Sequence, residues 1–427
     1  MSNFRKAEMW DKVQYLFRNY YDRMIHISAE MEGELDIDSF IKAVDLLVHK
    51  VEILRCSFRP NPISPFWALT SNYDIKDYIK IVYSDNVEAE LDKALTGFIP
   101  FDSEVQIRVT LVKGNNKCGY AILLNHMCAD GGDSKYLMGK LIELYADFVR
   151  GGDGTKVIIK QGTRANRQLY DRMPVEKAKK AKKLYKNISQ SKIKVKFPFT
   201  PTDATEKIQI FKMPVEGQFL TDLNAARKKH NATINDVALT AFFRTVYNYL
   251  SGEQKDFNIV SMMDLRRYCG GETLGVTNMT GFAPCAITVD KEPFAETLAK
   301  VKKQMEKNKQ DEFMGLYSLP LLKLAFTILP YAISELAIKI GYQNPLIGMS
   351  NIGIMEREKF QLLNTKMTKG FMTGASKYKP YMQLTAITFD QTITFAIAEK
   401  CNEKDAVIIK QFLMDYKKEL LEFCKNA

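Results

Sequence analysis

One short segment of the 427-residue chain combines residue types that can transfer protons. Residues 123–132 read LLNHMCADGG, so that His126 follows an apolar run and Asp130 comes four residues later. A neutral imidazole can act as a general base near pH 7. The adjacent glycines, Gly131 among them, permit a tight turn and the close approach of a ligand. From the spacing alone we favour a plainer interpretation, in which the histidine is satisfied within a loop and Asp130 only caps a helix that begins near Ser134.

Five other residues are candidates for supporting roles, each with a plainer alternative. Cys128 lies two residues from the histidine, but a small buried residue is a simpler interpretation than a thiol nucleophile, because no feature of the segment favours the thiolate. Asp264 and Arg266 follow an apolar run and either brace a site or form an ordinary strand-end ion pair. Ser350 and Asn351 either donate hydrogen bonds to an oxyanion or are strand-end polar residues without such a role.

The histidines and cysteines predict a protein without a metal site from a reducing compartment. The other three histidines, His26, His49 and His230, show no HExxH pattern and no paired Cys/His spacing, and we assign them no chemical role. The seven cysteines are scattered without CxxC spacing, and an odd number cannot close into a complete set of disulfides. Charged residues stand near the start where an export signal needs its apolar run, so we expect a cytoplasmic location.

Hydrophobic periodicity predicts the elements that must position the histidine. Alternation over Met24–Leu35 predicts a strand, and helical spacing over Ser39–Val51 predicts a helix. Val105–Val112 and Cys118–Leu124 flank a Gly-Asn-Asn turn and predict a hairpin. His126 therefore follows the second hairpin strand, and an apolar helix face begins after Ser134.

The second half of the chain shows the same mixture of patterns. It predicts strands at Ile208–Met213, Phe257–Met263, Gly281–Val289, Leu346–Ile354, Gln383–Phe389 and Thr392–Glu399, and helices at Leu220–Lys229, Asn235–Leu250, Phe294–Lys309 and Lys404–Phe423. The chain exceeds the ~250–300 residues over which one hydrophobic core keeps growing. We therefore predict two α/β lobes, residues 1–155 and 201–427, joined by a basic linker at residues 156–200.

The segment around His126 resembles the HxxxDG signature of the superfamily that contains condensation domains and chloramphenicol-acetyltransferase-like acyltransferases. Other stretches are similar to that superfamily in order and spacing over nearly the whole chain: Met31–Asp36, Ala43–Val48, Lys50–Phe58 with its Glu, Leu, Arg and Phe, Val260–Arg266, Leu274–Asn278, and Ser350–Gly353. The sequence at Gly275–Asn278 departs from the superfamily motif, so the roles of the residues in this stretch stay open.

The resemblance implies an α/β (α+β) fold of two chloramphenicol-acetyltransferase-like lobes, each a mixed sheet packed with helices, with a tunnel between them. It implies that His126 takes the proton from an acceptor hydroxyl or amine, that Gly131 leaves room beside the carbonyl, and that Asp130 holds the loop through an ion pair with Arg55. The first histidine of the double-histidine signature is Asn125 here. Single-histidine acetyltransferases also lack it, which favours them over a peptide-bond-forming module.

The function implied by this resemblance is acyl transfer from a thioester, of coenzyme A or of a pantetheinyl carrier protein, to a small alcohol or amine, hydrophobic acceptors included. It implies a monomer without a tightly bound cofactor or metal. Two alternatives remain: a stand-alone condensation enzyme acting on carrier-protein substrates, and a catalytically silent binding protein of the same fold. A nucleic-acid partner would rest on net charge alone, without interleaved aromatic residues or a recognisable binding motif, and is not expected.

The net charge of +11 is concentrated in one stretch of the chain. Residues 156–196 hold 14 lysines and arginines against Asp171 and Glu176, a balance of +12, so the rest of the chain carries −1. This stretch is either a solvated linker face or a surface that attracts the phosphates of coenzyme A, an acidic carrier protein or an anionic membrane. Peripheral membrane contact is thus one possible consequence.

The most apolar window, Leu316–Tyr342, is interrupted by two prolines and by charged residues. A membrane span needs ~20 largely uninterrupted apolar residues. We therefore predict a buried or interfacial helix here, with a core helix favoured over a surface for a hydrophobic substrate.

Overall fold

The computed structural model describes residues 3–71, 73–185, 197–250, 255–271, 275–317, 319–341 and 346–426. The strands within these residues are β1 (Phe4–Lys6), β2 (Met24–Gly33), β3 (Cys56–Arg59), β4 (Phe66–Leu69), β5 (Ile79–Tyr83), β6 (Ile107–Lys113), β7 (Lys117–Asn125), β8 (Lys207–Glu216), β9 (Asp256–Asp264), β10 (Thr280–Thr288), β11 (Ile347–Ile354), β12 (Thr365–Thr373), β13 (Lys377–Tyr378), β14 (Met382–Phe389) and β15 (Thr392–Cys401). The α-helices are α1 (Met9–Leu16), α2 (Ile37–Lys50), α3 (Val87–Leu95), α4 (Gly131–Val149), α5 (Arg167–Asp171), α6 (Val175–Ala181), α7 (Gly217–Lys229), α8 (Ile234–Tyr249), α9 (Phe294–Gln310), α10 (Leu319–Ile328), α11 (Tyr331–Gly341) and α12 (Glu403–Lys425). Two short 3₁₀ helices, η1 (Glu52–Arg55) and η3 (Leu265–Cys269), lie near the site.

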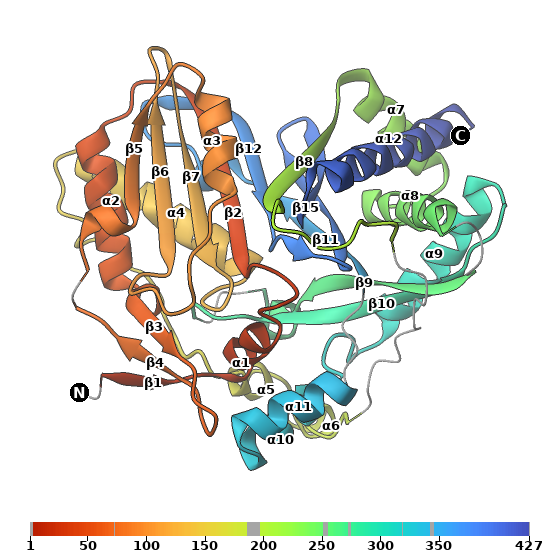
Figure 1. The fold of residues 1–427 in the computed structure, drawn as a ribbon, viewed down its shortest axis with the longest axis horizontal. Helices are drawn as coiled ribbons and strands as arrows, with labels where there is room; N and C mark the ends of the chain where they lie inside the picture. Colours follow the sequence, from red (N-terminus) through yellow and green to blue (C-terminus); the bar gives the residue numbers. More distant parts are fainter. Residues whose placement is uncertain are drawn as a thin grey trace.

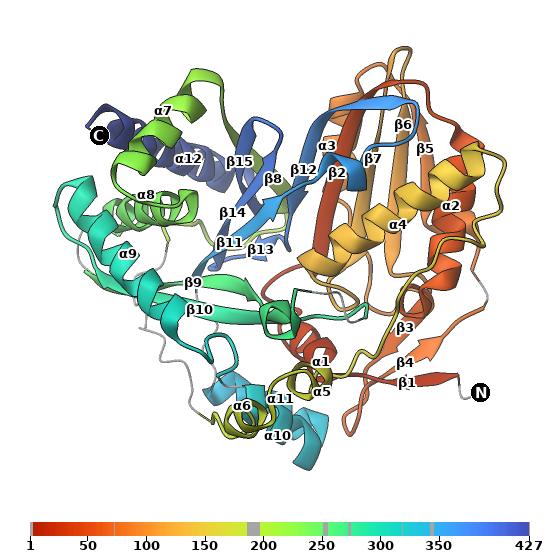
Figure 2. The same cartoon turned by 180° about the vertical axis from the view of Figure 1, so that it is seen from behind.

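Two lobes lie side by side (Figure 1). In the described residues the sheet of the first lobe has the strand order β12-β2-β7-β6-β5, and β2, β7 and β6 are antiparallel neighbours. Figures 1 and 2 show α4 on one face of this sheet and α3 on the other. The apolar run that ends β7 lies in the centre of this sheet and delivers Asn125 and His126 to its edge.

The sheet of the second lobe has the order β10-β9-β11-β14-β15-β13 in the described part of the chain, with β8 also paired to β15. Parallel pairs, such as β11 with β14, occur beside antiparallel ones, such as β9 with β10, so this sheet is mixed. Helices α8 and α12 pack together in its core, where the Tyr416 hydroxyl donates to the Ala238 carbonyl. The predicted fold of two mixed α/β lobes is confirmed.

Contacts between the lobes cross the division predicted near residue 200. Strand β12, from the C-terminal half, pairs with β2 and extends the sheet of the first lobe. Helices α10 and α11 also pack with the first core, through side chains such as Phe326 and Ile338. Sequence periodicity could not reveal this exchange, because it indicates the type of an element and not the sheet that the element joins. Strand β12 itself was also missing from the predicted elements.

The stretch predicted as a linker, residues 156–200, contains helices in its described part. Residues 156–185 contain α5 and α6, and Leu169 and Ala181 are fully buried in the first core, whereas residues 197–200 are described without regular secondary structure. Residues 186–196, with the remaining lysines of the basic stretch, lie outside the described residues. The first part of the stretch is therefore packed structure with lysines on its outer face.

Gly119 in β7 provides a test of the packing that supports the histidine. A Cβ atom there would lie 2.6 Å from the Ala29 carbonyl oxygen and 2.8 Å from the Leu91 Cδ1 atom. We expect Gly119→Ala to lower the free energy of unfolding, measured with urea, by about 1–3 kcal/mol because a backbone atom must move. The control is Gly139→Ala in α4, where the nearest neighbour atom is 3.5 Å away and alanine favours the helix. Equal effects of the two substitutions would contradict this packing.

Candidate active site

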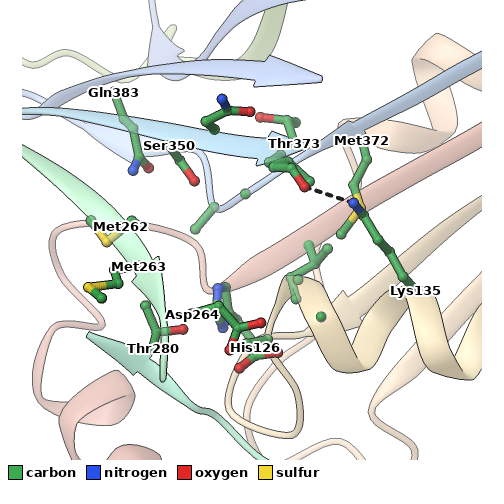
Figure 3. A pocket seen from close by; sticks show the side chains of 18 of the residues that line it. His126, Lys135, Met262, Met263, Asp264, Thr280, Ser350, Met372, Thr373 and Gln383 are labelled. Carbon is green, nitrogen blue, oxygen red and sulfur yellow. Dashed lines mark hydrogen bonds between the residues drawn. The ribbon is translucent and has the colours of Figure 1, made fainter. Parts of the chain in front are cut away.

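A cavity of about 510 Å³ lies where the two lobes meet, and both lobes contribute to its walls. His126 and Gly131 line it from the first lobe, and Met262 and Ser350 line it from strands of the second. Figure 3 shows His126 and Asp264 on one side of the cavity, with Ser350 and Gln383 across it. A substrate in this cavity would therefore touch both lobes.

The His126 ring is held by Asn278, a residue to which the sequence analysis gave no role. The Nδ1 atom of His126 is 3.0 Å from the Oδ1 atom of Asn278, whose amide nitrogen donates to the His126 carbonyl at 2.8 Å. Because the Asn278 amide nitrogen is the donor to that carbonyl, the atom that faces His126 Nδ1 is the Asn278 oxygen, which can only accept. Nδ1 of the neutral imidazole therefore carries the proton. The Nε2 atom then has a free lone pair, as a general base requires.

Burial lowers the pKa of His126 below its ordinary value. The negative charge of Asp130 acts in the opposite direction, but its effect on the pKa is smaller than that of burial. The imidazole is therefore neutral near pH 7. A histidine in this state can accept a proton.

The side chain of Asn125 supports the turn that carries the histidine. The Asn125 amide donates to the Gln106 side chain at 2.7 Å and accepts from the Met127 N–H at 3.0 Å. Asn125 is fully buried, so in this chain the position before the histidine supports the turn. Cys128 is also fully buried, and burial raises the pKa of its thiol, which favours the protonated form.

Arg164 holds the other side of the same turn. Its guanidinium donates to the carbonyls of Met127 and Cys128 at 2.9 and 2.6 Å, and to the Asp11 carboxylate at 2.6 Å. It also donates to the Val276 carbonyl at 2.6 Å. The role of Arg164 was missed from the sequence, where this residue is one of the 14 positive charges of the basic stretch.

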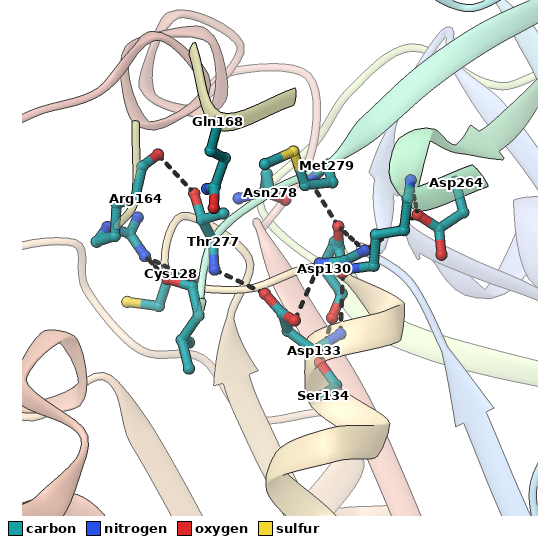
Figure 4. A network of polar contacts seen from close by, with 12 residues as sticks. Cys128, Asp130, Asp133, Ser134, Arg164, Gln168, Asp264, Thr277, Asn278 and Met279 are labelled. Carbon is teal, nitrogen blue, oxygen red and sulfur yellow. Dashed lines mark hydrogen bonds and ion pairs between the residues drawn. The ribbon is translucent and has the colours of Figure 1, made fainter. Parts of the chain in front are cut away.

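Asp130 forms its ion pair with Arg266, so the predicted pair with Arg55 is wrong. The Oδ2 atom of Asp130 is 2.9 Å from Nη1 of Arg266, and both side chains are about 95% buried (Figure 4). Arg55 lies in η1, where its Nε atom is buried without a hydrogen-bond partner among the described residues. The resemblance implied that Asp130 has a cationic partner, but it did not indicate which lobe contributes that residue. The partner, Arg266, comes from the second lobe.

Three consecutive residues just before β10, Thr277, Asn278 and Met279, join this cluster to the histidine. The Thr277 N–H donates to Asp133 and the Met279 N–H donates to Asp130, both at 2.7 Å. Asn278, between them, holds His126. The two carboxylates thus fix the backbone on each side of the residue that orients the imidazole (Figure 4).

The pKa values of the two carboxyl groups are shifted in opposite directions. Burial alone would raise the pKa of Asp130, but Arg266 and two backbone N–H donors hold it below its usual range. Burial and the charge of Asp130 raise the pKa of Asp133 to about 7. Asp130 is also the N-cap of α4, where its Oδ1 atom accepts the Asp133 N–H at 3.0 Å. Its observed contacts are therefore those of a positioning residue.

The other residues predicted for the site lie in or beside the cavity. Gly131 lines the cavity, where an added Cβ would meet only the Met372 methyl group at 3.8 Å. Asp264 caps η3 by accepting the Arg266 N–H and lies 3.2 Å from that guanidinium. Ser350 and Asn351 both line the cavity, and the Oδ1 atom of Asn351 accepts the Gly353 N–H within its own strand.

Lys377 was missed by the sequence analysis and also lines the cavity. Burial lowers the pKa of its ammonium group to about 8, and its Nζ lies 4.3 Å from the centre of the Tyr21 ring. Among the described residues, no group of three or more histidines, cysteines and acidic side chains is placed to hold a metal ion.

The Asp130–Arg266 pair can be tested by a double-mutant cycle. We expect Arg266→Met to lower the free energy of unfolding by about 3–5 kcal/mol and Asp130→Asn by less, because loss of the arginine leaves two buried carboxylates without their cation. The double variant should be less destabilised than the sum of the two, as measured by urea unfolding. Arg55→Met is the control, and its effect should simply add to that of Asp130→Asn. Coupling to Arg55 in place of Arg266 would refute the assignment.

Comparison with known proteins agrees with this architecture. The family model described as Condensation domain matches residues 14–324. Gramicidin S synthase 2 of Aneurinibacillus migulanus is 29% identical over 119 residues, which are 27% of this chain and only 3% of that protein.

Two solved structures show the same fold at low sequence identity. The trichothecene 15-O-acetyltransferase of Fusarium sporotrichioides has a TM-score of 0.68 and 13% identity, over 98% of this chain and 95% of that one. The epimerization domain of the third module of tyrocidine synthetase B has a TM-score of 0.66 and 13% identity, over 99% and 97%. With a family model that matches most of its length, this chain belongs to the condensation-domain family.

Proposed function

We propose that the protein is an acyltransferase that moves an acyl group from a pantetheinyl thioester to an alcohol or amine, with His126 as the general base. The observation that carries this proposal is the hydrogen bond between His126 Nδ1 and Asn278, because it leaves Nε2 as the proton acceptor in an inter-lobe cavity. The family includes proteins that perform different reactions on one fold, so the reaction must be argued from these residues.

The proposed step is a direct transfer without an acyl-enzyme intermediate. The acceptor oxygen or nitrogen attacks the thioester carbonyl carbon while Nε2 of His126 takes its proton. Collapse of the tetrahedral intermediate breaks the carbon–sulfur bond, and the imidazolium returns the proton to the leaving thiolate. The products are an ester or amide and a free thiol, and the histidine is restored.

The opposite wall supplies groups for orienting the substrate. The side chains of Ser350 and Gln383 line the cavity across from His126 (Figure 3). A hydroxyl or amide N–H directed at the developing oxyanion would stabilise it, with one such donor typically worth ~3 kcal/mol. Because the amide nitrogen of Asn351 already donates to the Oδ1 atom of Asn235 at 3.4 Å, we favour Ser350 over Asn351 for this role.

The donor can be coenzyme A or a carrier protein, since both present the same pantetheinyl thioester. The partial match to gramicidin S synthase 2 favours a carrier protein, and the likeness to an acetyltransferase keeps coenzyme A as a candidate. Assays with acyl-coenzyme A and with the same acyl group on a carrier protein distinguish the two sources. A silent binding protein would release thiol from neither.

Substitution of the histidine tests the proposed base. We expect His126→Ala to lower kcat for release of free thiol by about 10²–10⁴-fold, because the acceptor loses its proton acceptor. The matched control is His49→Ala, on the exposed face at the end of α2, which should leave turnover unchanged. Full activity in His126→Ala, with the thermal unfolding curve unaltered, would rule out the mechanism.

The pH dependence of kcat/KM provides a second test. Only the neutral imidazole accepts a proton, so activity rises with pH through the pKa of His126 in the free enzyme. Because burial lowers that pKa, the midpoint of the rising limb should lie below ~6.5, the value of an exposed imidazole. A midpoint at or above 6.5, or the same limb in the residual activity of His126→Ala, would contradict the assignment.

A further inference from the structure

The helical hairpin formed by α10 and α11 exposes an unusual amount of aliphatic surface. Seven of its large apolar side chains are exposed, among them Ile340 at 74%, Ile328 at 67% and Leu336 at 61%. The other four are Leu321, Leu324, Leu329 and Ile333. The predicted buried or interfacial helix at Leu316–Tyr342 is thus a hairpin with an outward apolar face, whereas Ser318 and Tyr342 lie outside the described residues.

The inner face of the hairpin is packed, so its position on the protein is defined. Phe326 and Tyr331 are buried and stack with their ring centres 5.9 Å apart. Arg18 and Glu335 form an ion pair at 2.9 Å. The Tyr331 N–H donates to the carbonyl of Ile63, which adds a further side chain, 73% exposed, beside the hairpin.

Positive charge lies next to this apolar face. Residues 175–185 hold five lysines and one glutamate, and Lys179, Lys180, Lys182 and Lys183 are exposed. Lys177 of α6 lies 5.8 Å from the ring centre of Phe313, shortly before α10 begins. Figures 1 and 2 both show α6, α10 and α11 together at the bottom of the molecule.

We propose that the α10–α11 face and the lysines of α6 form a docking surface for an anionic lipid bilayer. Aliphatic side chains with neighbouring lysines are the pattern of helices that lie in the membrane interface. Residues 319–340 contain one acidic residue, Glu335, and its charge is balanced by Arg18 and Lys339. The surface thus attracts anionic headgroups, and its leucines and isoleucines enter the acyl-chain boundary.

The composition and length of the hairpin argue against other occupants. Protein interfaces are typically anchored by tyrosine, tryptophan and arginine, and the exposed apolar side chains of α10 and α11 are all leucine, isoleucine or alanine. A second copy would bring its own α6 lysines against these. Helices of 10 and 11 residues are ~15 Å long, so they would lie along the bilayer surface. No helix in the described residues combines the length and apolar content needed to cross a membrane.

Docking in this way would bring the cavity close to the bilayer. On α1, Lys12 lies 5.6 Å from the ring centre of Phe326 in the hairpin. Trp10 and Val13 of the same helix line the cavity that holds His126. One helix therefore separates the apolar face from the proposed active site.

Co-sedimentation of the full chain with lipid vesicles tests the proposal. We expect binding to vesicles of phosphatidylglycerol and phosphatidylcholine in equal parts, with at least tenfold weaker binding to phosphatidylcholine alone. The triple variant Ile328→Glu, Leu336→Glu, Ile340→Glu should bind at least tenfold more weakly than the wild type. The single variant Ile340→Glu should show a smaller loss and serves if the triple variant is poorly folded.

Matched variants on α12 are the controls. Val407, Met414 and Leu421 are exposed apolar residues of that helix, and their replacement by glutamate should leave vesicle binding unchanged. Replacing Lys179, Lys180, Lys182 and Lys183 by glutamine should weaken binding, whereas the same change at Lys404, Lys410, Lys417 and Lys425 of α12 should not.

Three results would overturn the proposal. The first is no binding of the wild type to anionic vesicles, and the second is equal losses in the hairpin and α12 variants. The third is self-association of the wild type, abolished by the triple variant, without vesicle binding, which would make the face an interface between copies. Thiol release measured in solution is independent of all three, so failure here leaves the proposed acyl transfer standing.

Discussion

The buried ion cluster of Asp130, Asp133 and Arg266 is the interaction on which the site depends. It joins the turn after β7, in the first lobe, to η3, which follows β9 of the second lobe. Each ion would be costly to bury alone, and the cluster persists because a guanidinium lies between two carboxylates that also accept backbone N–H groups. Gly132 belongs to this arrangement, since a Cβ there would lie 2.9 Å from Nη1 of Arg266.

The cluster acts on the chemistry through the backbone. Fixing the N–H groups of Thr277 and Met279 also fixes Asn278, and Asn278 determines which nitrogen of His126 carries the proton. The ion cluster therefore orients the imidazole of His126 indirectly, through the backbone that carries Asn278. Arg164 completes the support, because it holds the carbonyls on the far side of the same turn.

The sequence was informative where local pattern determines structure. The strands and helices around His126, and the position of the histidine after a central strand, follow from periodicity and turn residues. Contacts between distant segments could not be obtained in this way. The partner of Asp130 is 136 residues away, β12 joins the other lobe's sheet, and Arg164 was hidden in a stretch that charge counting marked as a linker. Apolar composition also did not predict burial, since the most apolar window of the chain forms a hairpin with an exposed face.

The proposed mechanism depends on one state of His126, a neutral imidazole with Nε2 free. Nitrogen-15 NMR of the histidine side chains at pH 7 tests it most directly, with the His126 signals assigned by their loss in His126→Asn. We expect the tautomer protonated at Nδ1, and a shift toward a mixture of tautomers in Asn278→Ala, which removes the acceptor. A His126 that is protonated at Nε2, or charged at this pH, would contradict it.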